Sequence, residues 1–345
     1  MSETMKAVDI KGGRGPKENL FIRSDMPKPI PGSGEVLVKV KAFGINRMDT
    51  IQRLGDYPLP PQAPKTLGVE FSGIIQTFGP GSHGTFKQGD EVFGLAYGGA
   101  YAEFIAVNHQ MLLHKPASLT WEQAAGIPEA IIHKLTFSQT WITATQALFL
   151  VGKFAAGKTV LWHAGVSGVS IAGIQLAKDA GAAAVYATAG SRTKCEFVVR
   201  EIGATAAFDY KTEDWVARIK EATNGKGVDI IIDFIGGGYF QKNLDVAARD
   251  AHIVQLGLLG GSKIDGADIE QLLYKRIRIE GSTLRSREIE YQGKLRDRLE
   301  EYIPHFETGD LKVVIDTVLP WEEIQKAHGM LEANSTSGKI ICTIS

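Results

Sequence analysis

The chain has 345 residues, a formal net charge of −1, 44% hydrophobic residues and 22% charged residues. At about 150 residues per domain, this length predicts about two domains that each bury a core. The near-neutral charge argues against a nucleic-acid-binding protein and against a protein held on membranes by a basic patch. Apolar runs such as 228–235 are far shorter than the roughly 20 residues of a transmembrane helix, so none is expected.

The N-terminus and the cysteines indicate the compartment. Residues 1–6 contain no apolar signal core, which argues against secretion. Cys195 and Cys342 are too few for a disulfide scaffold or a four-thiolate zinc site. We therefore expect a cytoplasmic protein of a reducing compartment.

The first third of the chain is predicted to be rich in β-strands. Short apolar or alternating runs lie between clusters of glycine and proline, which supply the turns. The expected strands cover 36–42, 73–77, 91–95 and 102–107. Many short strands at close spacing favour a compact β barrel or sandwich.

From residue 159 onward, expected strands alternate with expected helices. The strands cover 159–163, 183–187, 206–210, 228–235, 252–256 and 277–282. The helices cover a stretch that ends at Ala180, then 192–202, 213–222, 239–247 and 269–274. This alternation predicts a doubly wound parallel sheet of the dinucleotide-binding type, in an α/β protein. A last apolar strand at 339–344 indicates that the chain returns to its first domain.

The turn after the first strand of this series is a candidate phosphate-binding turn. Its residues 160–170 combine a strand, small residues and a helix start, so that helix amides can approach a pyrophosphate. A strict G-x-G-x-x-G motif is absent, because Ser167 and Ser170 follow Gly165 where glycines would stand. An ordinary strand-to-helix turn is the alternative interpretation.

The end of the second strand favours NADP(H) over NAD(H). NAD-binding domains usually place an acid there to hold the ribose hydroxyls, whereas residues 188–194 contain no acid. Ser191, Arg192 and Lys194 could instead hold a 2′-phosphate through charge-assisted bonds. The alternative is that Arg192 and Lys194 are solvated helix residues.

Eight short segments extend these signals along the whole chain. They are 44–49, 52–57, 67–70, 123–130, 163–169, 257–261, 284–287 and 338–340. On these segments the chain resembles the zinc-free quinone oxidoreductases of the medium-chain dehydrogenase/reductase superfamily, and within them the p53-inducible subgroup.

The resemblance implies a GroES-like β-rich catalytic domain and an inserted Rossmann NADP-binding domain. The expected boundaries give residues 1–134 and 285–345 to the catalytic domain and 135–284 to the cofactor domain. We also expect a homodimer.

The same resemblance implies the site residues, with the nicotinamide in a cleft between the domains. Tyr57 and Asn46 are the expected catalytic residues. The expected cofactor-binding residues are Asn46, Tyr57, Gly165, Ser167, Gly168, Val169, Gly190, Ser191, Lys194, Tyr210, Leu258, Leu259, Leu284, Arg285, Ser286 and Asn334. Two alternatives stay open: Tyr57 could be a packed loop tyrosine, and Asn46 a turn residue that satisfies backbone amides.

No metal is expected. The zinc-dependent relatives place Cys and His where this chain has Asn46 and Arg47, and a His-Glu pair where it has Val69 and Glu70. Zinc needs about four N, S or O ligands. Neither cysteine lies in this region, so the chain lacks the donors.

One segment departs from the family pattern. Residues 131–140 stand where the family continues directly from Pro128-Glu129-Ala130 to Trp141. This insertion could lengthen a helix, form a flap on the substrate side or reflect an error in the gene model.

The expected reaction is hydride transfer from NADPH to a quinone or another conjugated carbonyl. Negative charge develops on the acceptor oxygen, and the Tyr57 hydroxyl and Asn46 amide are candidate donors to it. Two alternatives remain: an enoyl-thioester reductase acting with a biosynthetic synthase, and a sensor or structural protein that binds NADPH with little turnover.

Overall fold

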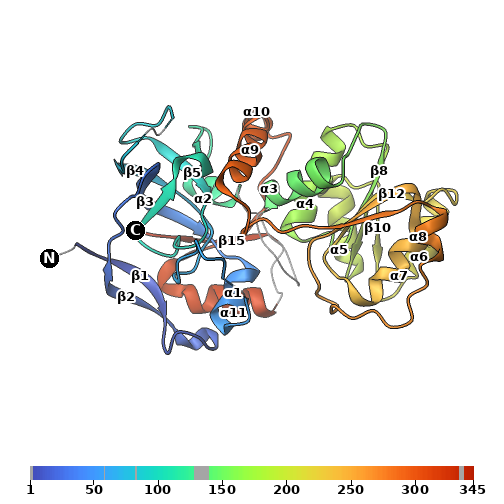
Figure 1. The fold of residues 1–345 in the computed structure, drawn as a ribbon, viewed down its shortest axis with the longest axis horizontal. Coiled ribbons are helices and arrows are strands. Elements are labelled where there is room, and N and C mark those ends of the chain that lie inside the picture. The colour runs from blue at the N-terminus through green and yellow to red at the C-terminus, as the bar shows by residue number, and fades with distance from the viewer. Residues whose placement is uncertain (1–2, 58, 82–83, 128–139, 334–337) are drawn as a thin grey trace. The chain divides into compact units, whose positions relative to one another are not determined.

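A computed structural model describes residues 3–57, 59–81, 84–127, 140–333 and 338–345 (Figure 1). The chain splits into two compact units. The N-terminal part joins residues Leu284–Ser345 in unit 1, and residues Thr143–Thr283 belong to unit 2. The sequence-based boundaries at 134/135 and 284/285 stay predictions, since the first lies outside the described residues.

The strands of unit 1 pair mainly in the antiparallel direction. Its strands are β1 (Thr4–Ile10), β2 (Leu20–Pro27), β3 (Glu35–Gly44), β4 (Glu70–Phe78), β5 (Glu91–Leu95), β6 (Phe104–Asn108), β7 (Leu112–His114), β14 (Ile315–Pro320) and β15 (Lys339–Thr343). Seven of them form one sheet in the order β14-β15-β3-β4-β5-β7, with β6 also paired to β3, while β1 and β2 form a separate hairpin. The predicted β-rich first part is therefore confirmed.

The C-terminal strand joins the N-terminal ones. In β15, Ile341 pairs with Gly44 of β3 and Thr343 pairs with Ala42. The predicted return of the chain to its first domain is confirmed. Because β3 pairs with β4, β6 and β15, residues distant in sequence meet around this strand.

Helices cover parts of unit 1. They are α1 (Arg47–Leu54), α2 (Trp121–Gly126), α9 (Ile289–Glu300), α10 (Ile303–Thr308) and α11 (Ile324–Ala333). A further helix, α3 (Thr140–Thr145), continues into a π-helical turn at Gln146–Val151.

Unit 2 is a six-stranded parallel sheet with helices on both faces (Figure 1). Its strands are β8 (Thr159–Trp162), β9 (Ala184–Ala189), β10 (Ala206–Asp209), β11 (Val228–Asp233), β12 (Ala247–Gln255) and β13 (Arg278–Gly281). Its helices are α4 (Gly168–Asp179), α5 (Arg192–Phe197), α6 (Trp215–Ala222), α7 (Phe240–Val246) and α8 (Glu270–Tyr274). The order β10-β9-β8-β11-β12-β13 reverses direction at β8, as in doubly wound dinucleotide-binding domains. The predicted fold class is confirmed.

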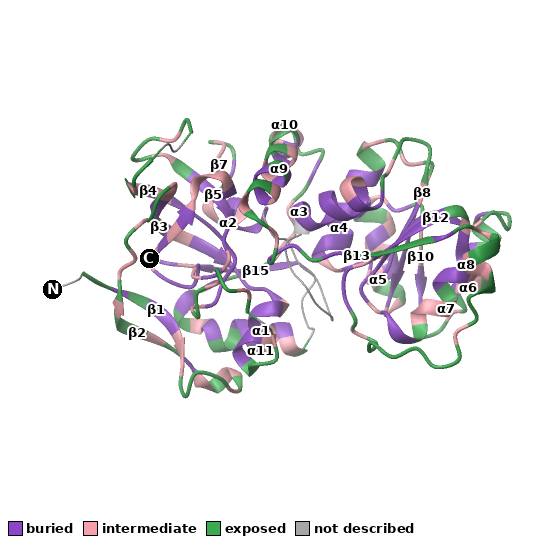
Figure 2. Ribbon diagram, viewed as in Figure 1, coloured by how far each residue is buried: buried purple, intermediate pink, exposed green. Residues whose placement is uncertain are grey.

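The core of unit 2 lies between this sheet and its helices. The central strands β8 and β11 are buried along most of their length, whereas the edge strand β13 is exposed (Figure 2). Leu161, Ile231 and Ile253 come from three neighbouring strands and pack with Trp215 of α6 and Leu244 of α7. Apolar residues at these positions explain why the sequence predicted buried strands here.

One boundary prediction is wrong. The expected helix through residue 247 ends at Val246, and β12 begins at Ala247 instead of residue 252. Residue 247 pairs with Val228 of β11, so a long-range strand contact overrides the local helical pattern.

Among the described residues, no helix combines the length and apolar character that a bilayer crossing would need.

Candidate functional site

The predicted catalytic residue Asn46 lies in a buried polar cluster of unit 1. It precedes α1, while Glu70 begins β4 and Lys339 begins β15, and all three side chains are 0% exposed. The Lys339 ammonium donates to Asn46 Oδ1 at 2.7 Å and forms an ion pair with Glu70. Asn46 Nδ2 donates to Glu70 Oε1 at 3.1 Å. Gly44 allows this approach, because a Cβ there would overlap Glu70 and Lys339.

This cluster defines what the Asn46 side chain does in the described fold. Its amide oxygen and nitrogen both bond to charged groups of the cluster. A buried ion pair is tolerated only when hydrogen bonds complete it, and the Asn46 amide supplies two of them. The structure therefore places Asn46 as a partner of the ion pair, and a catalytic contact to an acceptor stays a prediction.

Asp49 fastens the first turn of α1. Its carboxylate accepts from the backbone nitrogen of Asn46 at 2.9 Å, from that of Gly68 at 3.1 Å and from the Tyr101 hydroxyl at 2.9 Å. Burial raises the pKa of Asp49, while these donors and the Arg285 charge oppose the rise. The network fixes the start of α1 and thereby the helix that leads to Tyr57.

Tyr57 lies just beyond the C-terminus of α1, whose cap residue Gly55 has a left-handed conformation with φ of 87°. The tyrosine is half-buried. The guanidinium carbon of Arg285 lies 5.2 Å from the centroid of its ring. Of the predicted segment 284–286, Leu284 and Arg285 are buried and Ser286 is exposed. The structure thus brings Tyr57 and Arg285 together.

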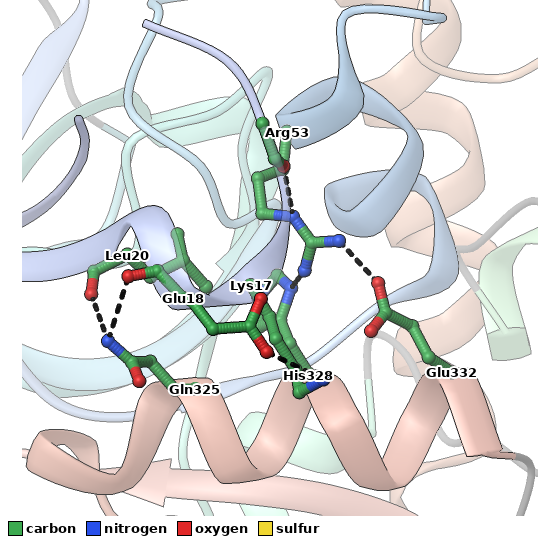
Figure 3. Close-up of polar contacts among 8 residues, drawn as sticks. Lys17, Glu18, Leu20, Arg53, Gln325, His328 and Glu332 are labelled. Carbon is green, nitrogen blue, oxygen red and sulfur yellow. Dashed lines mark hydrogen bonds and ion pairs between the residues drawn. The ribbon is translucent and has the colours of Figure 1, made fainter. Parts of the chain in front are cut away.

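A second buried cluster joins α1 to α11 (Figure 3). The Arg53 guanidinium, 1% exposed, donates to the Gly15 carbonyl at 2.9 Å, lies 3.0 Å from His328 Nδ1 and forms an ion pair with Glu332. Burial, with help from the charges of Arg53 and Arg47, lowers the pKa of His328 to about 3. His328 is therefore neutral at physiological pH.

In unit 2, the candidate phosphate-binding turn has the predicted form. Ser167 caps α4, and its hydroxyl accepts from the backbone nitrogen of Ser170 at 3.2 Å. A Cβ on Gly165 would lie 2.7 Å from Ala187 Cβ, so only glycine lets the turn approach β9 this closely. Gly168 and Val169 form the first turn of α4. The N-terminus of this twelve-residue helix is suited to a pyrophosphate.

The predicted 2′-phosphate residues gather at the end of β9. A Cβ on Gly190 would lie 2.8 Å from the Tyr210 hydroxyl, so these two predicted residues are neighbours. Ser191 caps α5, and its hydroxyl accepts from the backbone nitrogen of Lys194 at 3.3 Å. Arg192 instead pairs with Glu196 at 3.1 Å, and its side chain is 84% exposed. The solvated alternative therefore describes Arg192.

Sequence reasoning missed His163, which directly follows the carboxyl end of β8. The ring is fully buried, with Nδ1 3.0 Å from Thr188 Oγ1 and Nε2 2.7 Å from Asn243 Oδ1. Asn243 Nδ2 in turn donates to Asp233 Oδ2 at 2.9 Å, and Asp233 accepts from the backbone nitrogen of Gly236. Burial lowers the pKa of His163. The network joins the ends of β8, β9 and β11, and polar residues at the ends of apolar strands are the signal that could have revealed it.

The remaining predicted residues of unit 2 lie in the loop after β12. Leu258 is 51% exposed and Leu259 half-buried. The backbone nitrogen of Leu259 donates to the Phe234 carbonyl at 3.1 Å, which ties this loop to the end of β11. Asn334 and residues 131–139 of the insertion lie outside the described residues, so those expectations stay predictions.

Within the described ranges, no group of three or more His, Cys, Asp or Glu residues could hold a metal ion. Cys195 and Cys342 are buried, and burial raises the pKa of the Cys195 thiol to about 11.

Comparison with known proteins identifies the family. The model "Alcohol dehydrogenase GroES-like domain" matches residues 32–117, and the model "Zinc-binding dehydrogenase" matches residues 168–302. A quinone oxidoreductase of Homo sapiens is 31% identical, over 98% of this chain and 97% of its own. The chain belongs to the quinone oxidoreductase family of the medium-chain dehydrogenases/reductases. It is therefore an oxidoreductase.

Solved structures agree with this family fold. The quinone oxidoreductase of Escherichia coli, complexed with NADPH, has a TM-score of 0.80 and 27% identity, over 99% of this chain and all of its own. An NAD-dependent alcohol dehydrogenase has a TM-score of 0.82 and 31% identity, at the same coverage. The expected combination of a GroES-like domain with a Rossmann domain is confirmed.

Proposed function

We propose that this protein is a zinc-independent oxidoreductase that transfers hydride from NADPH to a quinone or another conjugated carbonyl. Its family membership supports a nicotinamide cofactor and a small-molecule acceptor. The observation that carries the choice of NADPH is the acid-free end of β9, where Gly190 adjoins the Tyr210 hydroxyl and Lys194 stands in the first turn of α5.

The residues of unit 2 fit such a cofactor. The glycine approach at Gly165 and the amides at the start of α4 suit a pyrophosphate. The Tyr210 hydroxyl and the Lys194 ammonium would hold the 2′-phosphate, where an acid would repel it. When bound, NADPH supplies the hydride, which leaves with two electrons and yields NADP⁺.

In unit 1, Tyr57 would serve the acceptor. Hydride addition to a conjugated carbonyl places negative charge on the acceptor oxygen, which then takes up a proton from the phenol or from water. The half-buried Tyr57 side chain is a donor suited to that oxygen. Asn46 is a weaker candidate because Glu70 and Lys339 occupy its amide.

Two features support zinc independence. Asn46 and Val69 stand where zinc-dependent relatives have cysteine and histidine, so thiolate and imidazole donors are missing. In addition, the buried Lys339 ammonium already neutralises Glu70 beside Asn46. A divalent cation at this place would be repelled by that ammonium.

A substrate panel tests the proposal. Purified protein would be mixed with NADPH or NADH and with quinones, enones or enoyl thioesters, and the absorbance of the reduced nicotinamide followed. Oxidation of NADPH by quinones or enones is expected. A preference for enoyl thioesters would favour the biosynthetic alternative, and NADPH binding without turnover with any acceptor would indicate a sensor or structural protein.

A further inference from the structure

Arg285 is a buried cation placed against the ring of Tyr57, and both residues belong to unit 1. The arginine is 4% exposed, and its guanidinium carbon lies 5.2 Å from the centroid of the tyrosine ring. A guanidinium at this distance over an aromatic face is attracted by the ring quadrupole. The contact joins the loop after α1 to the segment that re-enters unit 1 at Leu284.

The guanidinium is held in place by groups other than Tyr57. Its Nε donates to the Tyr97 carbonyl at 2.6 Å, and Nη1 donates to Gln52 Oε1 at 2.9 Å. A Cβ on Gly98 would lie 3.1 Å from Nη2, so glycine leaves the room that the guanidinium needs. An arginine anchored by its planar fork presents its charge at a defined place.

We propose that Arg285 is a positioning residue for Tyr57. Its guanidinium holds the tyrosine ring in place and stabilises negative charge on the phenol oxygen. The proposal rests on the proposed function, in which the Tyr57 hydroxyl donates to the acceptor oxygen. Electron density grows on the phenol oxygen as it donates, and a fixed cation that is shielded from water favours that change. The resemblance assigns Arg285 to the cofactor instead, and the two roles have different consequences.

A measurement without turnover tests the electrostatic part. The protein would be labelled with 3-fluorotyrosine, the Tyr57 signal assigned in ¹⁹F NMR spectra with Tyr57→Phe, and its phenol titrated. In Arg285→Gln we expect the midpoint to rise by about 0.5–1 pH unit. Charged groups around this loop include Asp49 and Arg53 on α1, Asp56 beside the tyrosine, and Arg14, whose Cδ lies 3.1 Å from the Cβ position of Gly55. Glu288 and Glu290 lie near Tyr97, whose carbonyl binds Arg285. They are unchanged in this variant, so they contribute equally to both midpoints.

The segment itself offers a matched control. Arg287 stacks on Tyr291 at 4.8 Å, two residues beyond Arg285, so Arg287→Gln removes an equal charge from the same segment. It should leave the Tyr57 midpoint unchanged. If Arg285→Gln does not fold, Arg285→Lys tests the proposal instead. Lysine lacks the planar guanidinium fork that contacts the tyrosine ring, so the ¹⁹F chemical shift of Tyr57 must change. The proposal would be overturned if the folded Arg285 variants kept the parent's chemical shift and titration midpoint for Tyr57. It would also be overturned if Arg287→Gln changed them by the same amount.

Kinetics then separate positioning from cofactor binding. If Arg285 acts through Tyr57, Arg285→Gln should lower kcat about 3–20-fold with unchanged NADPH affinity, since one donor is worth up to 10²–10³-fold when fully effective. Adding this change to Tyr57→Phe should then cost little more. Additive losses accompanied by weaker NADPH binding would assign Arg285 to the cofactor. The ¹⁹F titration keeps its meaning even if quinones prove not to be substrates, so failure of the proposed function remains distinguishable.

Discussion

At the residue scale, Lys194 carries the prediction of cofactor choice. It stands in the first turn of α5, close in sequence to Gly190, which adjoins the Tyr210 hydroxyl. Arg192, the other cation of this segment, pairs with Glu196 and faces solvent. We therefore predict that Lys194, rather than Arg192, contacts a 2′-phosphate.

Lys194→Ala should weaken the binding of NADPH and hardly affect that of NADH. One charge-assisted phosphate contact is worth about 1.5–3 kcal/mol, which corresponds to roughly 10–150-fold in the dissociation constant. Fluorescence titration with both cofactors measures this, and Arg192→Ala is the control that should change little. Equal weakening for both cofactors would contradict the assignment.

Tyr57→Phe separates a donor from a packing residue. If the hydroxyl steadies the acceptor oxygen, kcat should fall roughly 5–50-fold with NADPH affinity nearly unchanged, since water can partly replace one donor. If the ring only packs, Phe should be almost silent and Ala should weaken cofactor binding. Turnover and NADPH affinity of both variants give the answer, and a fully active Phe variant would leave Tyr57 as a packing residue.

Metal independence is also a residue-scale prediction, from Asn46, Val69 and Lys339. Activity should survive prolonged incubation with a chelator, because the Lys339 ammonium already supplies the positive charge beside Glu70. Elemental analysis should find well under one zinc per chain. Stoichiometric zinc together with turnover that the chelator abolishes would show this assignment to be wrong.

At the element scale, buried polar groups join α1 to α11. Arg53 of α1 contacts His328 and Glu332 of α11, while Gln325 of α11 donates from Nε2 to the Leu20 carbonyl of β2 at 2.7 Å (Figure 3). Buried charge demands such partners, because an unpaired guanidinium in the interior is costly. This junction fixes α1, which carries Asn46 at one end and leads to Tyr57 at the other.

The neutral ring of His328 makes this junction sensitive to acid. Its pKa is about 3 in the folded protein, against about 6.5 for an unfolded chain. Below pH 6.5 the imidazole of His328 takes up a proton in the unfolded chain but stays neutral in the folded protein. The free energy of unfolding therefore decreases as the pH falls from 6.5 toward 3. Between pH 6.5 and 4.5 this contribution is about 2 kcal/mol.

Denaturant unfolding at several pH values measures the effect. His328→Gln keeps an acceptor for Arg53 but cannot titrate, so its stability should fall by about 2 kcal/mol less than the parent's over the same interval. The difference between parent and variant removes the contribution of the carboxylates, which titrate in both. Parallel pH profiles would show that His328 is not the group responsible.

At the scale of the whole molecule, the edge of the unit 2 sheet supports the expected homodimer. All four residues of β13 are exposed, and β13 is the last strand at its edge among the described strands. Nearby, Ile269, Leu273 and Tyr274 are 60%, 73% and 65% exposed. Of the four β13 residues only Ile279 is a large apolar residue, so the apolar surface at this edge comes mainly from residues 269, 273 and 274. We predict that a second copy of this chain covers this surface and the unpaired edge of β13.

Light scattering after gel filtration tests the homodimer. Ile279→Lys places a charge on β13 and should shift the protein toward the monomer. Val318→Lys is the matched control, because Val318 is similarly exposed on β14, the edge strand of the unit 1 sheet. A monomeric parent, or a dimer that persists in Ile279→Lys, would contradict this interface.

The sequence by itself determined the elements whose signals are local. The strand at 91–95 matches β5, and the apolar runs and turns between 159 and 282 predicted the six parallel strands in their order along the chain. The periodicity of apolar residues, the capping residues and the glycine turns are patterns that span only a few residues. They can therefore be recognised in a single sequence. The eight short segments likewise sufficed to indicate the family, because each can be recognised from the sequence alone.

Only the tertiary structure decided which distant polar groups meet. Lys339 reaches Asn46 and Glu70 because β15 and β4 both pair with β3, and no local pattern marks that meeting. Likewise Arg285 lies against Tyr57, although 228 positions separate them, and the start of β12 at Ala247 followed from its partner strand. Burial makes unpaired charges and backbone groups costly, so the long-range pairings that satisfy them, rather than local propensity, set these contacts.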